Sequence, residues 1–384
     1  MKNNNRPILE YIQDTIKALC SENGLTDART LLQIIDGTLR NIKKSMKKLT
    51  ALDIVDVHVS NIIRLIKKLF KNLKTLKKVI YSLANKYLSS RRKTYIIFDD
   101  TLIERYTETA FGTGIFYDHN EKRYITGNNI VSLHQVNDKI SLSLDYALYL
   151  TSDFIKKYNE ENIDKLEFKT KIKLAIEMLS EVLKKGLRGY VLGDAWFTCK
   201  ELIALLRERS VKYILGCKSD KHITLFGKEI TLKQIFEKAK LRYFHFDGIK
   251  YYYAVKTLNI KDWGRHKILA IKTENDDELK YYITNKLNMK PENIWKNYQN
   301  RKWIEAFYED AKEIIGLNKF YMHAKDSVIS HFNFIWYLYD ILAIYKAEKA
   351  ENGINVSIEG IFDEYNKFYN NLFKQQWDSI LCKT

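Results

Sequence analysis

Residues 95–101 read Tyr95-Ile96-Ile97-Phe98-Asp99-Asp100-Thr101. Four apolar residues followed by acidic and hydroxyl side chains are typical of a buried β-strand whose carboxyl end carries polar residues. A second stretch of this kind, residues 189–194, ends at Asp194. Open α/β sheets bind ligands beyond the carboxyl ends of their strands, so both strand ends are candidate sites. Isolated aspartates at strand ends are also common as turn formers or helix caps, and that alternative stays open here.

The segments after these strands predict an α/β core with one hairpin edge. Downstream of the first strand the pattern predicts, in order, strands at 129–136 and 140–150 around a turn at 137–139, a helix at about 167–185, a strand at 189–193, a helix at about 200–209 and a strand at 213–215. The order of three strands, helix, strand, helix and strand indicates a mixed sheet with flanking helices.

A β-rich insertion is expected to interrupt this core at about residues 220–285, where short turns separate aromatic-rich strands. The chain then returns to helix and stays largely helical to its end. The expected domains are therefore a small all-helical basic domain (1–90), a first part of the core (91–218), the insertion (219–286), and a second part of the core with the catalytic helix and C-terminal helices (287–384).

The charge of the chain points to a polyanionic partner. The formal net charge is +17, and residues 40–93 alone hold 16 Lys or Arg against two acidic residues. Lysines around a helical bundle often do no more than solvate it, but so large a local excess favours neutralisation by DNA phosphates. No run of eighteen apolar residues and no apolar leader is present, so we expect a cytoplasmic protein with no membrane partner.

A helix expected at residues 293–317 presents polar side chains along one line. At about 100° per residue, Tyr298, Arg301, Glu305 and Lys312 fall within a sector of roughly 60°. Taken alone, such a line is as well explained by a solvated face with ion pairs. With Asp99 and Asp194, however, Glu305 would supply three hard oxygen ligands for two Mg²⁺ ions with open positions for a substrate phosphate.

The same residues carry a resemblance to a known family. The spacing Tyr298-x2-Arg301-x3-Glu305-x6-Lys312 resembles the Tyr-Arg-Glu-Lys signature of one branch of bacterial insertion-sequence DDE transposases. Residues 98–101 (Phe-Asp-Asp-Thr) resemble the first-aspartate motif of that branch, and residues 193–197 (Gly-Asp-Ala-Trp-Phe) resemble the second. The motifs occur in the family's order and span about residues 95–320.

This resemblance implies an RNase H-like catalytic domain and a transposase. The implied activity is Mg²⁺-dependent cut-and-paste DNA transposition, with end cleavage by hydrolysis, hairpin formation and strand transfer. The implied partners are double-stranded DNA, as terminal inverted repeats and target, and a second copy of the chain in a synaptic homodimer. Two Mg²⁺ ions, with Mn²⁺ as a substitute, are the implied cofactors. The alternatives are an inactive, domesticated DNA-binding protein and an RNase H-like nuclease without joining activity.

The resemblance also assigns roles to residues. Asp99, Asp194 and Glu305 become the catalytic metal ligands, and Tyr298, Arg301 and Lys312 become DNA contacts. Asp100 competes with Asp99 for the first position, although only Asp99 is followed two residues later by threonine. The family stacks a flipped base on a tryptophan of the insertion. Trp263 is the one tryptophan in that segment, and a packing role within a hairpin is at least as good an explanation for it.

Overall fold

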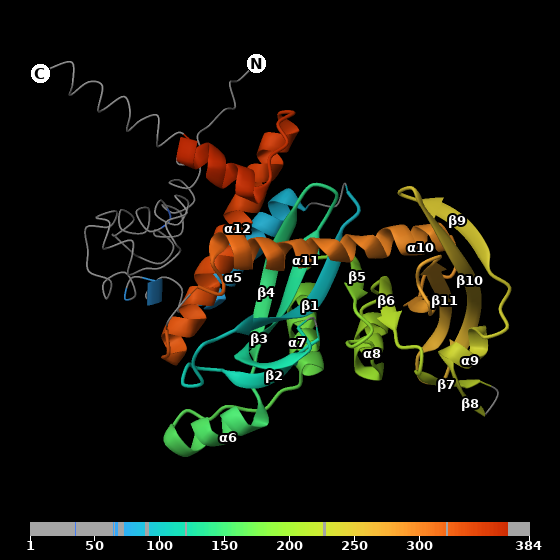
Figure 1. The fold of residues 1–384 in the computed structure, drawn as a ribbon, viewed down its shortest axis with the longest axis horizontal. Coiled ribbons are helices and arrows are strands. Elements are labelled where there is room, and N and C mark those ends of the chain that lie inside the picture. Colours follow the sequence, from blue (N-terminus) through green and yellow to red (C-terminus); the bar gives the residue numbers. More distant parts are fainter. Residues whose placement is uncertain are drawn as a thin grey trace, which may run out of the picture.

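The computed structural model describes most of the chain after its first seventy residues. The described residues are 73–88, 92–119, 121–225, 228–319 and 322–367, together with Ile35, Arg64, Ile66 and Lys67. The basic helical domain expected at 1–90 thus lies largely outside the described residues. The part of it that is described is mainly the helix α5 (Leu73–Tyr87). The remaining described elements form a layered α/β arrangement around one large mixed sheet (Figure 1).

The central strands of the sheet run in the order β4-β3-β1-β5-β6. They are β1 (Tyr95–Glu104), β3 (Arg123–Val136), β4 (Ser141–Tyr149), β5 (Tyr190–Gly193) and β6 (Tyr213–Cys217). β3 is antiparallel to both β1 and β4, whereas β1, β5 and β6 are parallel to one another. The predicted mixed α/β core with a hairpin edge is confirmed, and this order is compatible with an RNase H-like fold.

The apolar start of β1 forms the centre of this sheet. Residues 95–98 are at most 6% exposed, as expected for a strand covered on both faces. The ring of Phe98 lies across the neighbouring strand and meets Phe197 edge to face, with ring centroids 5.1 Å apart. A β-carbon at Gly193 would come within 2.6 Å of the Phe98 ring, so only glycine allows this close approach.

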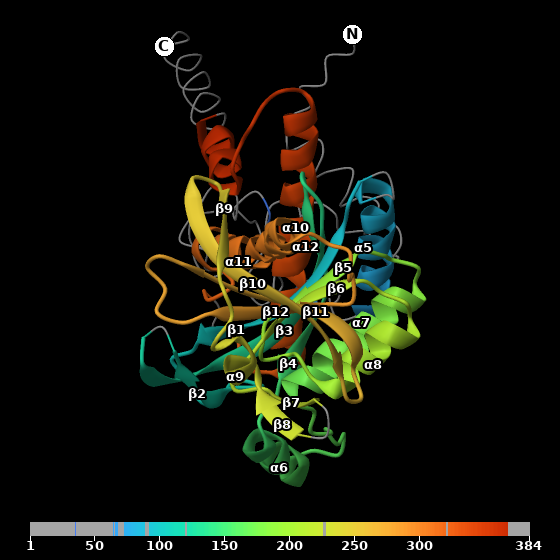
Figure 2. The same cartoon turned by 90° about the vertical axis from the view of Figure 1, so that its right-hand side faces the viewer.

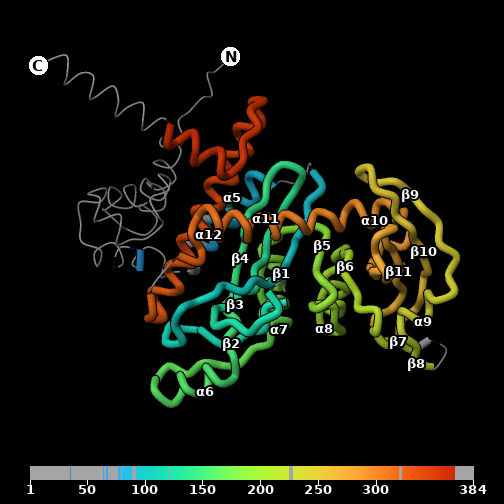
Figure 3. The backbone as a smooth tube through the Cα atoms, in the orientation of Figure 1, coloured from blue at the N-terminus to red at the C-terminus, as the bar shows by residue number. Residues whose placement is uncertain are grey.

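The sheet continues beyond β6 into the segment expected as a β-rich insertion. β6 pairs antiparallel with β12 (Lys280–Thr284), and the order goes on through β11 (Gly264–Thr273), β10 (Ile249–Ile260) and β9 (Arg242–Phe246). Figure 3 follows the chain through these strands, which lie at the opposite end of the molecule's long axis from α12 (Lys325–Glu351). Residues 219–286 therefore extend the core sheet, and of their described strands only the hairpin β7 (His222–Leu225) and β8 (Lys228–Thr231) stands apart.

Three short elements were not predicted from the sequence. They are β2 (Gly114–Asp118), α6 (Ser152–Glu161) and α9 (Leu232–Phe236). β2 pairs with the first residues of β3, which begins earlier than its apolar run suggests. Its residues are at most half-buried, so β2 lacks the apolar signal on which the sequence reading relied.

Helices cover both faces of the sheet. Asp145 of β4 pairs with Lys77 of α5 at 2.6 Å, whereas the hydroxyl of the next residue, Tyr146, donates to Asn333 of α12 at 2.7 Å. Consecutive strand residues point to opposite faces, so α5 and α12 lie on opposite faces of the sheet. Figure 2 shows α5 together with α7 (Lys171–Lys184) and α8 (Lys200–Glu208) on one side of the strands and α11 (Lys302–Glu309) on the other.

α12 is the central helix of its layer and is apolar on all sides. Among the described residues it is the one helix long and apolar enough to cross a membrane by length and composition. In this molecule 94% of its most apolar window is buried against other protein elements, as in a core helix of a soluble fold.

The helical run expected at residues 293–317 changes pitch along its length. It consists of α10 (Pro291–Tyr298), a 3₁₀ turn (Gln299–Arg301), α11, and a π-helical turn (Asp310–Ile315). Proline at the first position starts it, and Gly316, with a left-handed φ of 96°, ends it. The expectation of one regular α-helix is wrong in this respect, and residues after 309 leave the line that 100° per residue predicts.

Candidate active site

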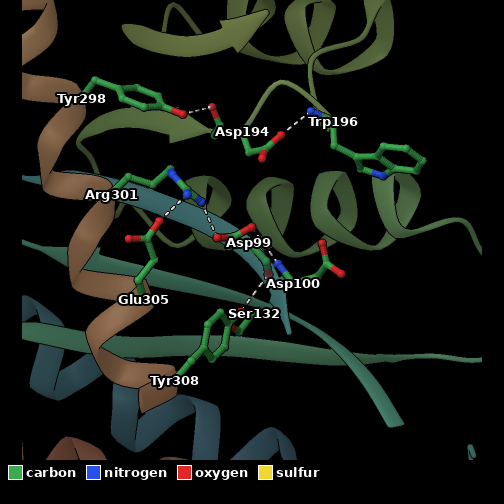
Figure 4. Close-up of polar contacts among 10 residues, drawn as sticks. Asp99, Asp100, Ser132, Asp194, Trp196, Tyr298, Arg301, Glu305 and Tyr308 are labelled. Atoms are coloured by element: carbon green, nitrogen blue, oxygen red, sulfur yellow. Dashed lines mark hydrogen bonds and ion pairs between the residues drawn. The ribbon is translucent and has the colours of Figure 1, made fainter. Parts of the chain in front are cut away.

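Two aspartates meet at the centre of the sheet because of the strand register. Phe98 of β1 and Gly193 of β5 are the last registered pair between these parallel strands. The next residue on each strand is an aspartate, Asp99 and Asp194. Neighbouring strands lie about 4.8 Å apart, so the register places the two aspartates side by side (Figure 4). Asp194 follows the carboxyl end of β5 as expected. The predicted strand end at Asp99 is wrong, because β1 continues to Glu104 through its pairing with β3, and only its pairing with β5 stops at Phe98.

Arg301 connects this pair to the helix that crosses the sheet. Its guanidinium donates to Oδ2 of Asp99 and to Oε1 of Glu305, one turn further along the helix (Figure 4). The Asp99 side chain is 15% exposed and that of Arg301 is 19% exposed, whereas Glu305 is half exposed. Charge-assisted bonds between poorly solvated groups are strong, so Arg301 holds the two carboxylates at a fixed separation.

Burial is the main influence on the titration of Asp99, and neighbouring charges modify it. Burial raises the pKa of Asp99 to about 7, Arg301 opposes that rise, and the charges of Asp100 and Asp194 add to it. The site holds three carboxylates, Asp99, Asp194 and Glu305, and Arg301 supplies one guanidinium between two of them, so their charge is not fully compensated. A site of this kind favours a further cation.

Two tyrosines fasten the crossing helix to the strands below it. The Tyr298 hydroxyl donates to the carbonyl oxygen of Gly193 at 3.4 Å. The Tyr308 hydroxyl donates to the carbonyl oxygen of Asp99 at 2.9 Å and also contacts Ser132 Oγ at 2.6 Å. Burial raises the pKa of both phenols, so both stay protonated. Tyr308 was not predicted as a site residue, although its position three residues after Glu305 continues the line of polar side chains formed by Tyr298, Arg301 and Glu305.

Asp100 lies away from this cluster. Its carboxylate accepts from Lys171 Nζ of α7 at 2.7 Å and from Asn129 Nδ2 at 3.2 Å. Alternation along β1 directs Asp99 toward α11 and Asp100 toward α7 on the other face. Of the two competing aspartates, the structure brings only Asp99 together with Arg301 and Glu305.

Two further candidates lie apart from the carboxylates. Lys312 is in the π-helical turn and lines a cavity of about 470 Å³ together with Asp118 and His323. Burial lowers the pKa of Lys312, and Asp118 partly offsets that effect. Trp263 is 6% exposed and packs near His266, with Lys221 Nζ 5.1 Å from its ring centroid. That environment is one of packing and leaves little of the ring open to a base.

Trp196 was not predicted as a site residue, although it belongs to the motif around Asp194. Its backbone N–H donates to Asp194 Oδ1, and its side chain is 56% exposed beside the site (Figure 4). Lys218 Nζ lies 4.7 Å from the ring centroid. The hydrogen bond orients the Asp194 carboxylate, which an exposed strand end alone would leave free to rotate.

The donor chemistry of the site fits a divalent cation. Asp99, Asp194 and Glu305 are hard oxygen donors, as Mg²⁺ requires, and three carboxylates against the one guanidinium of Arg301 favour cation binding. Among the residues that the structure describes, no three His, Cys, Asp or Glu side chains lie close enough to hold one ion. Arg301 explains this spacing, since its guanidinium lies between two of the three donors.

Comparison with known proteins adds one finding. The sequence model of one protein family, described as DDE superfamily endonuclease, matches residues 21–231. The match covers more than half of the chain and includes Asp99 and Asp194. No curated protein matches the chain.

Proposed function

Because this chain belongs to the DDE superfamily endonuclease family, we propose that it is a transposase whose catalytic carboxylates are Asp99, Asp194 and Glu305. Membership makes the chain an enzyme of the nuclease or transposase type that acts on DNA. The observation that carries the assignment of residues is the registered pair of strands. It puts Asp99 beside Asp194, and Arg301 links Asp99 to Glu305 on the crossing helix.

Endonucleases of this superfamily generally use divalent metals, and we assign two Mg²⁺ ions, replaceable by Mn²⁺, to this site. When bound, they supply Lewis-acid activation of a water or 3′-hydroxyl nucleophile and stabilisation of the leaving oxygen. The contribution of the protein is to position the carboxylates. β1 and β5 fix Asp99 and Asp194 at the floor of the site, and the half-exposed Glu305 can adjust from the side.

Arg301 has two tasks in this proposal. Without metal it neutralises Asp99 and Glu305, which keeps the site folded. Its planar guanidinium also has the geometry to bind two oxygens of a DNA phosphate, and Arg301 would take this role when the carboxylates hold metal. Tyr298, held at Gly193 by its hydroxyl, lies beside it as a second DNA contact.

The proposed reaction is cut-and-paste transposition of an insertion sequence. The chain would hydrolyse the transposon ends, pass through hairpin intermediates and join the ends to target DNA as a synaptic homodimer. Support comes from the family match, from the arrangement of the acids, and from the Tyr-Arg-Glu-Lys spacing.

Replacement of single acids tests the assignment. Asp99→Asn and Asp194→Asn should each lower Mg²⁺-dependent cleavage of the element's own flanking DNA by about 10³-fold or more, because the acids act as a unit. Asp100→Asn is the matched control, since it removes the same charge one residue away on the other face of β1. It should retain most of the activity.

Single-turnover cleavage and joining, with melting temperature as a check on folding, measure these effects. Full activity in Asp194→Asn would contradict the proposal. Cleavage without strand-transfer products would identify a nuclease that does not join. Binding without cleavage by the unaltered protein would identify an inactive DNA-binding protein.

A further inference from the structure

A second cavity lies on the other side of the catalytic helix. Its volume is about 660 Å³. Its helical lining includes Gln299, Asn300, Trp303 and Ala306 but neither Arg301 nor Glu305. The rest of the lining comes from the start of β1, the β3–β4 turn and the end of β9: Arg92, Lys93, Tyr95, Asp138 and Phe246.

The lining of the cavity, as far as the structure describes it, holds more cations than acids. Lys93, Lys296 and Lys302 line it. Within the part of the chain that the structure describes, neither Lys296 nor Lys302 forms an ion pair. Asp138, the one acid among the described lining residues, is 3.2 Å from Arg92. Such a cluster repels itself unless an anion binds between its members.

The surroundings of Lys93 give a second sign of this repulsion. Its ammonium donates to Asn297 Oδ1 at 2.7 Å and lies 4.7 Å from the centroid of the Tyr190 ring. Burial lowers the pKa of Lys93, and the charges of Lys212 and Lys296 lower it further. The charges that act on the pKa of Lys93 are thus those of two other lysines, and no carboxylate opposes them. A bound phosphate would relieve it.

The floor of the cavity suits a nucleic-acid chain better than a small anion. Three aromatic residues, Tyr95, Phe246 and Trp303, line it together with the amides of Gln299 and Asn300. Lysines bind phosphates, amides donate to phosphate and sugar oxygens, and aromatic rings pack on sugars and bases. The volume also exceeds the needs of one inorganic anion and is typical of sites for larger ligands.

We propose that this cavity binds the phosphodiester backbone of a DNA segment distinct from the one at the carboxylates. The inference rests on the proposed action on DNA and adds a second contact to it. Tyr95 and Asp99 are four residues apart on β1, which corresponds to about 13 Å. The helix from residue 296 to 306 lies between the two places, so the same phosphate cannot occupy both. The enzyme would grip DNA on both sides of its catalytic helix.

The test compares two pairs of lysines that carry the same charge. Lys296→Gln with Lys302→Gln removes two cations of the cavity, and both side chains are exposed. Lys156→Gln with Lys157→Gln removes two exposed cations from α6, which lies at a distant edge of the molecule (Figure 1). Affinity for a mixed-sequence DNA duplex is measured against salt concentration in EDTA, so that cleavage plays no part.

The cavity pair should reduce the slope of log affinity against log salt by about 1.8, since each lost phosphate contact removes about 0.9. The α6 pair should leave the slope as in the unaltered protein. An unchanged slope in the cavity pair, or an equal loss in both pairs, would overturn the proposal. The proposal would also be overturned if the unaltered protein binds inorganic phosphate saturably, the cavity pair alone loses that binding, and the slope of the cavity pair for duplex DNA stays unchanged.

The outcome is separable from that of the proposed function. If the cavity pair loses salt dependence while Asp194→Asn still cleaves DNA, the cavity proposal stands and the assignment of the catalytic carboxylates fails. An unchanged slope with cleavage abolished by Asp194→Asn would do the reverse. Failure of the unaltered protein to bind any DNA would overturn both.

Discussion

At the scale of single residues, the site shows what spacing can and cannot predict. Strand ends and helical spacing predicted that Asp99, Asp194 and Glu305 would converge, and the structure links Asp99 to Glu305 through Arg301. Spacing did not predict that Arg301 would bind both acids, because charge pairing depends on which neighbours the fold brings within reach. The same limit applies to Asp100, whose pairing with Lys171 across 71 residues of sequence separates it from the cluster.

The double pairing of Arg301 leads to a prediction about metal and stability. Arg301→Ala leaves the poorly solvated Asp99 without its cation, and breaking such a pair should cost about 3 kcal/mol. Mg²⁺ should restore more stability to this variant than to the unaltered protein, since the ions replace the missing charge. Thermal unfolding with and without Mg²⁺ measures both effects.

Lys171→Ala is the matched control, because it removes the partner of Asp100 on the other face of β1. Its stability should fall without any added response to Mg²⁺. Equal responses in the two variants would show that Arg301 and the metal do not compete for the same carboxylates.

At the scale of elements, the helical run of residues 291–315 departs from its prediction. Periodicity located the run and its buried side correctly, as Ile304, Phe307 and Ala311 are fully buried. It could not reveal the 3₁₀ and π-helical turns, because these depend on packing against the sheet and α12. Lys312 lies in the π-helical turn and so leaves the line that a constant pitch predicts, and its role as a DNA contact stays a prediction.

The π-helical turn begins at Asp310, whose titration should make stability depend on pH. Burial raises the pKa of Asp310 to about 6, Lys346 opposes the rise, and Glu309 and Glu359 add to it. A folded-state pKa above the model value of 3.8 means that the folded protein binds the proton more tightly. This contribution to stability is present below pH 3.8 and is lost as pH rises through about 6.

Asp310→Asn should remove that contribution. As pH rises from 3.8 to about 6, the free energy of unfolding of this variant should therefore increase relative to that of the unaltered protein. Asp276→Asn provides a control of opposite sign, because the pKa of Asp276 is lowered to about 2, first by a hydrogen bond from the Thr273 backbone. The loss of unfolding free energy in Asp276→Asn, relative to the unaltered protein, should be constant above pH 3.8. Urea unfolding at a series of pH values measures both. A pH-independent difference for Asp310→Asn would refute the assignment.

At the scale of the whole molecule, local patterns predicted the strands but not their partners. Turns and aromatic strands in residues 219–286 were located correctly, whereas the pairing of β12 with β6 was not foreseen. Pairing between segments more than sixty residues apart leaves no periodic trace in either one. The predicted DNA-binding domain at 1–90 remains a prediction, since most of it lies outside the described residues.

The shared sheet predicts that residues 219–286 do not unfold alone. The ladder between β6 and β12 should give their amides similar free energies of opening in native-state hydrogen exchange, close to that of β1. Amides of α6, a peripheral helix with one buried residue, should open at lower free energy. Protection of β12 that disappears well before that of β6 would show an independent domain.

The registered pair of Phe98 and Gly193 has a consequence for how such an enzyme can change over evolution. The long stretch of chain between the two strands can gain or lose residues at its turns without moving either aspartate, because neighbouring strands hold them and not the connection. A slip of one residue in either strand, by contrast, would turn its carboxylate to the opposite face. Insertions and deletions should therefore be tolerated in the loops, whereas in the paired residues of β1 and β5 they should abolish activity.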